Sequence, residues 1–226
     1  RKTGRLFKST SFLFISAFLD FYVFSAAKYA IDARLNNAAS GYFNLIFMPT
    51  SVIYMVANFV IRPFLTRLTD LWTGKDYDCF RKELRRIGTI ILGLTVLAVG
   101  ATAVLGKWVL SVMEMILGSG YEGRLVSYYG AFIIIVLGGG FYALANLMYY
   151  ALVIMRRQKA IFTVYLAAAA AAAVLSGFLV SKFGINGAAG CYLLLMMGLV
   201  TGFGLHTAGA CQSEKKENTG NGGSNT

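Results

Sequence analysis

The sequence has very few of the side chains that usually carry enzyme chemistry. It contains one histidine, His206, and only ten acidic residues in 226. A Ser-His-Asp triad would have to use that histidine, which stands at the end of the last apolar stretch. The three cysteines are scattered without metal-ligand spacing, and Gly74-Lys75 lacks the rest of a phosphate-binding loop. We therefore expect no catalytic residue, no metal and no cofactor, and we do not expect an enzyme.

Charge is also scarce, which excludes an ordinary soluble domain. Charged residues make up 14% of the chain and hydrophobic residues 57%, whereas soluble domains carry about 25% charged residues. The net charge of +11 raises the question of nucleic acid. However, the basic residues gather in the gaps between apolar runs, so we expect no nucleic-acid partner. The composition instead indicates a membrane protein whose solvent is lipid.

Apolar stretches of membrane-spanning length recur along the chain. A span needs about 20 apolar residues, and only helices or closed barrels can cross lipid. The sequence thus predicts an all-α, polytopic membrane protein with a six-helix transmembrane lobe over 10–207. The expected spans are 10–31, 41–62, 87–106, 125–153, 160–181 and 184–207. A basic lead-in (1–9) precedes them, and a polar, disordered tail (208–226) follows.

The distribution of lysine and arginine predicts the orientation. Sixteen of the 21 basic residues lie in the lead-in, the 62–86 connection, the connection after 153 and the tail. Because cytoplasmic connections carry the excess of Lys and Arg, both termini of this segment are expected in the cytoplasm. The chain opens with Arg1 rather than Met, and we expect it to be a fragment of a longer protein.

The 62–86 connection contains a second helical pattern. Phe80, Leu84 and Ile87 recur at helical spacing among basic residues, which predicts a basic amphipathic helix at about 78–86. Such a helix would lie on the inner leaflet, attracted to anionic lipid by about 1 kcal/mol per charge. Membrane lipids are therefore expected partners.

Polar residues follow one face of the second span. Steps of four and three residues keep them on one stripe through the expected membrane thickness. The stripe consists of Asn44, Met48, Ser51, Met55, Asn58 and Arg62. One interpretation is a water-filled path. The other is interhelical hydrogen bonding by Asn and Ser, worth about 0.6–2 kcal/mol each.

Charges inside the first span are the other candidate site residues. Asp20 lies in its middle, and a charge there costs roughly 2.5–3.5 kcal/mol on insertion scales. It is interpreted as a proton or cation carrier, a partner for a basic residue, or a polar group lining a cavity. Lys28 either binds an anionic head group or snorkels to the outer interface, and Asp32 can pair with it at i, i+4. Asn146 and Tyr149 in the fourth span, one turn apart, are weaker candidates.

Three consecutive glycines, Gly138 to Gly140, stand in the middle of the fourth span. They permit a bend, which suits a transporter, or equally they permit tight packing without motion.

Several of these residues carry a family resemblance. Lys28-Tyr29-Ala30-Ile31-Asp32, followed by Leu35 and Gly41-Tyr42-Phe43, resembles the seventh and eighth spans of bacterial oligosaccharide flippases. These proteins belong to the multidrug/oligosaccharidyl-lipid/polysaccharide exporter superfamily. Phe47-Met48-Pro49, Arg62-Pro63-Phe64-Leu65 and the glycine-alanine segment 183–189 continue the resemblance, which covers 10 to about 207.

Membership would imply one lobe, the C-terminal half, of a twelve-helix exporter in the bacterial cytoplasmic membrane. The implied cargo is a sugar chain on polyprenyl pyrophosphate, flipped for lipopolysaccharide or capsule assembly by alternating access. Lys28 and Arg62 would then meet the pyrophosphate. The implied partners are an N-terminal six-helix lobe of the same protein and polysaccharide polymerase or assembly proteins.

Three other functions remain open from the sequence. Asp20 favours a cation-coupled drug or metabolite exporter of the same superfamily. A membrane-embedded glycosyltransferase or polymerase would need outer loops rich in carboxylates or histidine, and the expected outer connections are short and poor in them. A structural assembly subunit is the last alternative.

Overall fold

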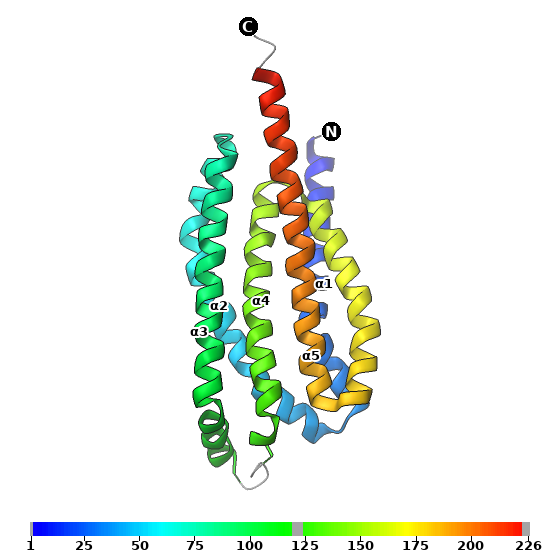
Figure 1. Cartoon of the computed structure of the whole chain (residues 1–226). Helices are drawn as coiled ribbons and strands as arrows, with labels where there is room; N and C mark the ends of the chain where they lie inside the picture. The colour runs from blue at the N-terminus through cyan, green and yellow to red at the C-terminus, as the bar shows by residue number, and fades with distance from the viewer. Residues whose placement is uncertain (1, 119–123, 223–226) are drawn as a thin grey trace.

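Long helices make up the computed structural model, which describes residues 2–118 and 124–222 (Figure 1). In chain order they are α1 (Lys2–Arg34), α2 (Asn37–Thr73), α3 (Tyr77–Leu117), the short 3-10 helix η1 (Val126–Tyr128), α4 (Tyr129–Ile154) and α5 (Gln158–Gly222). The described residues contain no strand. Within them, five helices are long and apolar enough to cross a membrane. The all-α class is confirmed, and the helices have the lengths that a multi-pass membrane protein requires.

The last element, α5, is bent into two arms. Gly184 adopts φ 57° and ψ −132°, and the element joins two helices across this kink. A side chain at Gly187 would overlap the carbonyl group of Leu179, so the returning arm passes close to the first. Figure 1 shows the yellow and orange arms side by side. The expected spans 160–181 and 184–207 are thus arms of one bent element, because a single left-handed glycine reverses the chain without a loop.

Successive connections lie at alternate ends of the bundle, as the charge pattern predicts. Both termini, the α2–α3 turn and the α4–α5 turn lie at one end in Figure 1. The α1–α2 turn, the end of α3, the start of α4 and the kink of α5 lie at the other. The four segments that are rich in Lys and Arg therefore share one end, as required if they face one side of a membrane.

The predicted amphipathic helix 78–86 forms the first turns of α3 instead of a separate surface helix. Its apolar residues Phe80, Leu84 and Ile87 are buried within the protein. Phe80 packs its ring 5.2 Å from that of Trp72 on α2, and buried Glu83 lies 3.6 Å from Arg67 of α2. The sequence pattern found the apolar face, but α2 extends to Thr73 and covers it.

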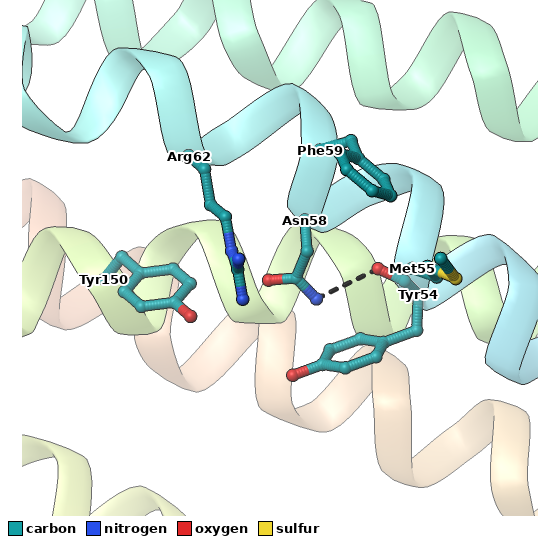
Figure 2. Close-up of a pocket in the computed structure, with 6 residues that line it drawn as sticks. All are labelled: Tyr54, Met55, Asn58, Phe59, Arg62 and Tyr150. Carbon is teal, nitrogen blue, oxygen red and sulfur yellow. Dashed lines mark hydrogen bonds between the residues drawn. The ribbon is translucent and has the colours of Figure 1, made fainter.

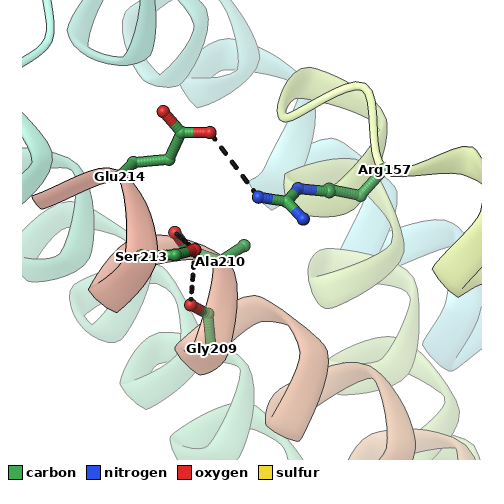
Figure 3. Close-up of polar contacts among 5 residues, drawn as sticks. All are labelled: Arg157, Gly209, Ala210, Ser213 and Glu214. Atoms are coloured by element: carbon green, nitrogen blue, oxygen red, sulfur yellow. Dashed lines mark hydrogen bonds and ion pairs between the residues drawn. The ribbon is translucent and has the colours of Figure 1, made fainter. Parts of the chain in front are cut away.

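The polar tail also differs from the expectation. Instead of ending near residue 207, α5 continues as helix to Gly222, while 223–226 lie outside the described residues. Ala210 and Cys211 are buried, and Glu214 pairs with Arg157 of the α4–α5 turn at 3.5 Å (Figure 3). These contacts stabilise as helix a segment whose composition indicates disorder.

The centre of the bundle is α4, which packs against α2, α3 and α5. Its three glycines each meet a different helix. A Cβ on Gly138 would lie 2.7 Å from the Tyr192 ring of α5, and one on Gly139 would lie 3.2 Å from Thr50 of α2. A Cβ on Gly140 would overlap Thr95 of α3. Because α4 runs through them as one helix, they serve close packing here.

Replacing Gly140 tests this packing. Gly140→Ala would force a methyl group into Thr95, and we expect it to lower the free energy of unfolding by about 1–3 kcal/mol. Gly130→Ala in the same helix is the matched control, because nothing lies within 4 Å of its added Cβ. Denaturant titration of the purified protein in micelles measures both. Equal stability of the Gly140→Ala protein and the parent would contradict the packing role.

Candidate functional site

A pocket of about 430 Å³ opens between α2 and α4. This volume lies in the range of roughly 300–1,000 Å³ that is usual for ligand sites. Its lining consists of Tyr54, Met55, Asn58, Phe59, Arg62 and Tyr150 (Figure 2). Asn58 and Arg62 belong to the polar stripe predicted from the sequence. The structure therefore places two of the predicted site residues in one cavity.

The stripe itself lies on the outer face of α2. Met48 is 65% exposed and Met55 59%, and Asn44, Ser51 and Arg62 are also exposed. The other side of the helix is buried against the bundle, through residues such as Phe43, Ile46, Phe47, Ala57 and Ile61. The predicted face is confirmed, whereas a water-filled path along it stays a prediction.

Hydrogen bonds fix the amide groups at the pocket. Asn58 donates through Nδ2 to the carbonyl oxygen of Tyr54 at 3.0 Å. Its Oδ1 accepts from Nδ2 of Asn146 on α4 at 3.2 Å. Asn146, one of the weaker candidates, is thus joined directly to Asn58. This pair is the interhelical bonding foreseen as the alternative to a path, and it stands at the edge of the pocket.

Arg62 supplies the charge of the pocket. Its guanidinium group extends between Asn58 and the ring of Tyr150 in Figure 2. The positive charge of Arg62 interacts electrostatically with the Tyr150 hydroxyl. The lining holds no carboxylate, and no described acidic residue forms an ion pair with Arg62. A guanidinium with an amide and phenols beside it can bind the oxygens of an anionic group, because its fork donates two parallel hydrogen bonds.

Asp20 lies in the interior between α1 and α4, away from any basic partner. Its Oδ2 accepts a hydrogen bond from the hydroxyl of Tyr142 at 3.0 Å. Its Oδ1 is buried and has no hydrogen-bond partner among the described residues. The hydroxyl of Tyr165 on α5 also interacts with this carboxyl group, and the rings of Tyr149 and Tyr192 lie near its charge. Among the described residues, Asp20 therefore forms no ion pair with a basic residue.

A ring contact links Asp20 to the pocket. The ring of Tyr142 lies 5.2 Å from that of Tyr54, which is part of the lining. A movement of the Asp20–Tyr142 pair would therefore shift Tyr54 and, with it, one wall of the pocket. Asp20 itself does not line it.

Lys28 lies apart from Arg62. Its Nζ lies 4.5 Å from the centre of the Phe47 ring. The negative charge of Asp32 attracts the positive charge of Lys28. Asp32 in turn accepts a hydrogen bond from Ser40. Phe47 precedes Arg62 by fifteen residues, roughly 22 Å along a straight helix. Lys28 and Arg62 therefore do not form one site within this chain.

The tyrosines of the site were not predicted as site residues. Tyr54 stands one turn before Asn58, and Tyr150 one turn after Asn146, so their helical spacing was a usable signal. No sequence pattern indicated Tyr142 as the partner of Asp20, because the two residues are 122 positions apart. Within the described residues, no three His, Cys, Asp or Glu side chains gather as a metal site.

The Asp20–Tyr142 hydrogen bond makes a prediction about stability. Tyr142→Phe leaves a buried carboxyl group without its partner, so we expect the free energy of unfolding to fall by about 1–2 kcal/mol. In an Asp20→Leu background the same change should have little effect. Unfolding titrations of the four proteins measure the coupling. Equal losses in both backgrounds would mean that the hydroxyl stabilises the bundle through another contact.

Comparison with known proteins adds no relative. No family model, curated protein or solved structure matches the chain. The flippase resemblance of the segments around Lys28 and Arg62 therefore remains an expectation.

Proposed function

We propose that this chain is one lobe of a transporter that flips polyprenyl-pyrophosphate-linked oligosaccharide across the bacterial cytoplasmic membrane. The observation that carries the proposal is the Arg62 pocket. It places an unpaired guanidinium, an amide and two phenols in a cavity of a membrane-length helix bundle. A pyrophosphate is an anion that such a group of donors binds, and the cargo class follows from the family resemblance.

The proposed lobe has six spans, which are α1 to α4 and the two arms of α5. The end that carries the termini and the basic connections faces the cytoplasm, according to the positive-inside rule. The stripe on α2 faces a central cavity, whose other wall is the N-terminal six-helix lobe. The cargo moves as the two lobes rock against each other, with no covalent chemistry.

Within this mechanism the chain binds the head of the cargo rather than its lipid tail. Arg62 and Asn58 hold pyrophosphate oxygens near the cytoplasmic half of the cavity, where the carrier lipid is loaded. Ser51 and Asn44 continue the polar face toward the opposite end. Lys28 stands beyond them, next to the aromatic ring of Phe47, and offers the next cation on the same route.

Loss of the Arg62 charge tests the proposal. We expect Arg62→Ala, introduced into the complete gene, to reduce surface polysaccharide about tenfold or more in a flippase-deficient bacterium, because a charge-assisted hydrogen bond is lost. Arg62→Lys should restore part of the activity. Arg85→Ala is the control, since it removes an exposed arginine that does not line the pocket.

Surface polysaccharide is scored against the amount of protein in the membrane. A normal level with Arg62→Ala would remove the proposed contact with the cargo. If the well-expressed parent restored nothing, the flippase assignment or the chosen sugar would be wrong.

The second candidate is a cation-coupled exporter, which Asp20 favours because its Oδ1 is buried and unpartnered. An oxygen of this kind is ready to take up a proton or a cation. In that case Asp20→Asn should abolish drug or metabolite efflux that depends on a proton or sodium gradient. Efflux in cells measures this, with Asp32→Asn as the control from the same helix. Gradient-dependent efflux at the parental rate in Asp20→Asn cells would eliminate this candidate.

A further inference from the structure

A second pocket, of about 460 Å³, lies at the end of the bundle away from the termini. It forms where the α1–α2 turn, the segment before α4 and the kink of α5 meet. Its lining consists of Leu35, Asn36, Ala38, Ala39, Tyr42, Arg124, Ser127, Tyr128, Gly184 and Ile185. We call it the end pocket. It shares no residue with the Arg62 pocket, and the proposed flipping mechanism leaves it unused.

The end pocket is positively charged. Arg124 is exposed, no carboxylate belongs to the lining, and no described acidic residue forms an ion pair with Arg124. The first turn of α2 also lines the pocket and adds the partial positive charge of a helix N-terminus. The pocket therefore favours a ligand with a negative charge.

Polar and aromatic groups surround this charge. Asn36 accepts from the backbone N–H of Ala39 through Oδ1 at 2.9 Å, so the donors of its amide group are directed to other partners. The rings of Tyr42 and Tyr128 lie 6.0 Å apart at 36°. Tilted rings of this kind offer apolar faces beside hydrogen-bonding groups. That combination suits a ligand that is rich in hydroxyl groups and has one apolar face.

A buried carboxylate holds one wall of the end pocket in place. Glu114 accepts from the backbone N–H groups of Leu125 at 2.6 Å and Val126 at 3.0 Å. The hydroxyl of Ser127 donates to the carbonyl oxygen of Arg124 at 2.5 Å. Arg124, Ser127 and Tyr128 thus come from a backbone that is tied to the end of α3. A wall ordered in advance lowers the entropy that a ligand must lose on binding.

We propose that the end pocket binds an acidic saccharide, that is, a sugar that carries a carboxylate. The guanidinium of Arg124 pairs with the carboxylate, Asn36 and Ser127 contact hydroxyl groups, and the partly exposed ring of Tyr128, backed by buried Tyr42, packs on the sugar ring. The proposal rests on the proposed function for its orientation, in which this end faces outward and meets the sugar chain as it leaves. A lone phosphate would pair with Arg124 but has no apolar face that could pack against the aromatic rings.

Calorimetric titration of the purified chain in detergent micelles tests this. The probes are trigalacturonic acid, the neutral sugar maltotriose and inorganic phosphate. We expect trigalacturonic acid to bind and the other two to bind about tenfold more weakly or not at all. Arg124→Gln should weaken trigalacturonic acid about tenfold or more. Tyr128→Leu, which removes a ring and no charge, should also weaken it.

Two control variants separate the end pocket from other sites. Lys107→Gln removes a cation that lies over the Tyr129 ring and outside the lining. Arg85→Gln removes an exposed arginine that lines neither pocket. Both should leave binding of trigalacturonic acid within about twofold of the parent, because neither residue touches the proposed ligand. Thermal unfolding of each variant verifies that it is folded.

Other outcomes would overturn the proposal. No binding of trigalacturonic acid, or equal binding of maltotriose, would remove the acidic saccharide. Tighter binding of phosphate would make the site a phosphate site. Equal losses of affinity for trigalacturonic acid in the Arg124→Gln and Lys107→Gln proteins would mean that binding depends only on general surface charge. Because this assay involves no transport, failure of the Arg62→Ala complementation test leaves its result unchanged, and the two proposals can fail separately.

Discussion

Close contact of the α4 backbone at Gly138, Gly139 and Gly140 with side chains of three neighbouring helices is the interaction on which the rest of the structure depends. Helices in lipid gain little from hydrophobic burial, so they associate through packing of small residues and interhelical hydrogen bonds. The three glycines let α4 touch α5, α2 and α3 within one turn. With α4 at this depth, Asn146 reaches Asn58, Tyr142 reaches Asp20, and Tyr150 closes the Arg62 pocket.

The polar groups of the bundle differ in whether they find hydrogen-bond or ion-pair partners inside it. Asn58 and Asn146 satisfy each other across two helices, and Tyr142 satisfies one oxygen of Asp20. Arg62 and the second oxygen of Asp20 remain without such partners among the described residues. Unsatisfied polar groups are costly in a low-dielectric interior. The buried Asp20 oxygen bears this cost, whereas Arg62 is exposed at its pocket, and the proposed transport role rests on these two groups.

The two pockets lie toward opposite ends of the helix bundle. The Arg62 pocket stands toward the basic end of the bundle, and the end pocket lies between the connections at the opposite end. Each contains one arginine without a carboxylate in its lining, and each borders tyrosine rings. The repetition of this chemistry at both ends fits the proposed anionic, hydroxylated cargo.

The sequence by itself determined the helical class, the presence of helices long and apolar enough to cross a membrane, and the sharing of one end by both termini and the basic connections. It also determined that the polar residues of α2 share one face. These features follow from local periodicity and from the position of charge along the chain, which need no partner. Only the tertiary structure decided that Tyr142 pairs with Asp20, that Lys28 stands apart from Arg62, and that Arg124 and Tyr42 line one pocket. It also decided that α2 covers the apolar face of 78–86, and that Arg157 holds the end of α5 through Glu214. Such contacts join residues far apart in the chain, and they depend on which helices pack together, which no local pattern records.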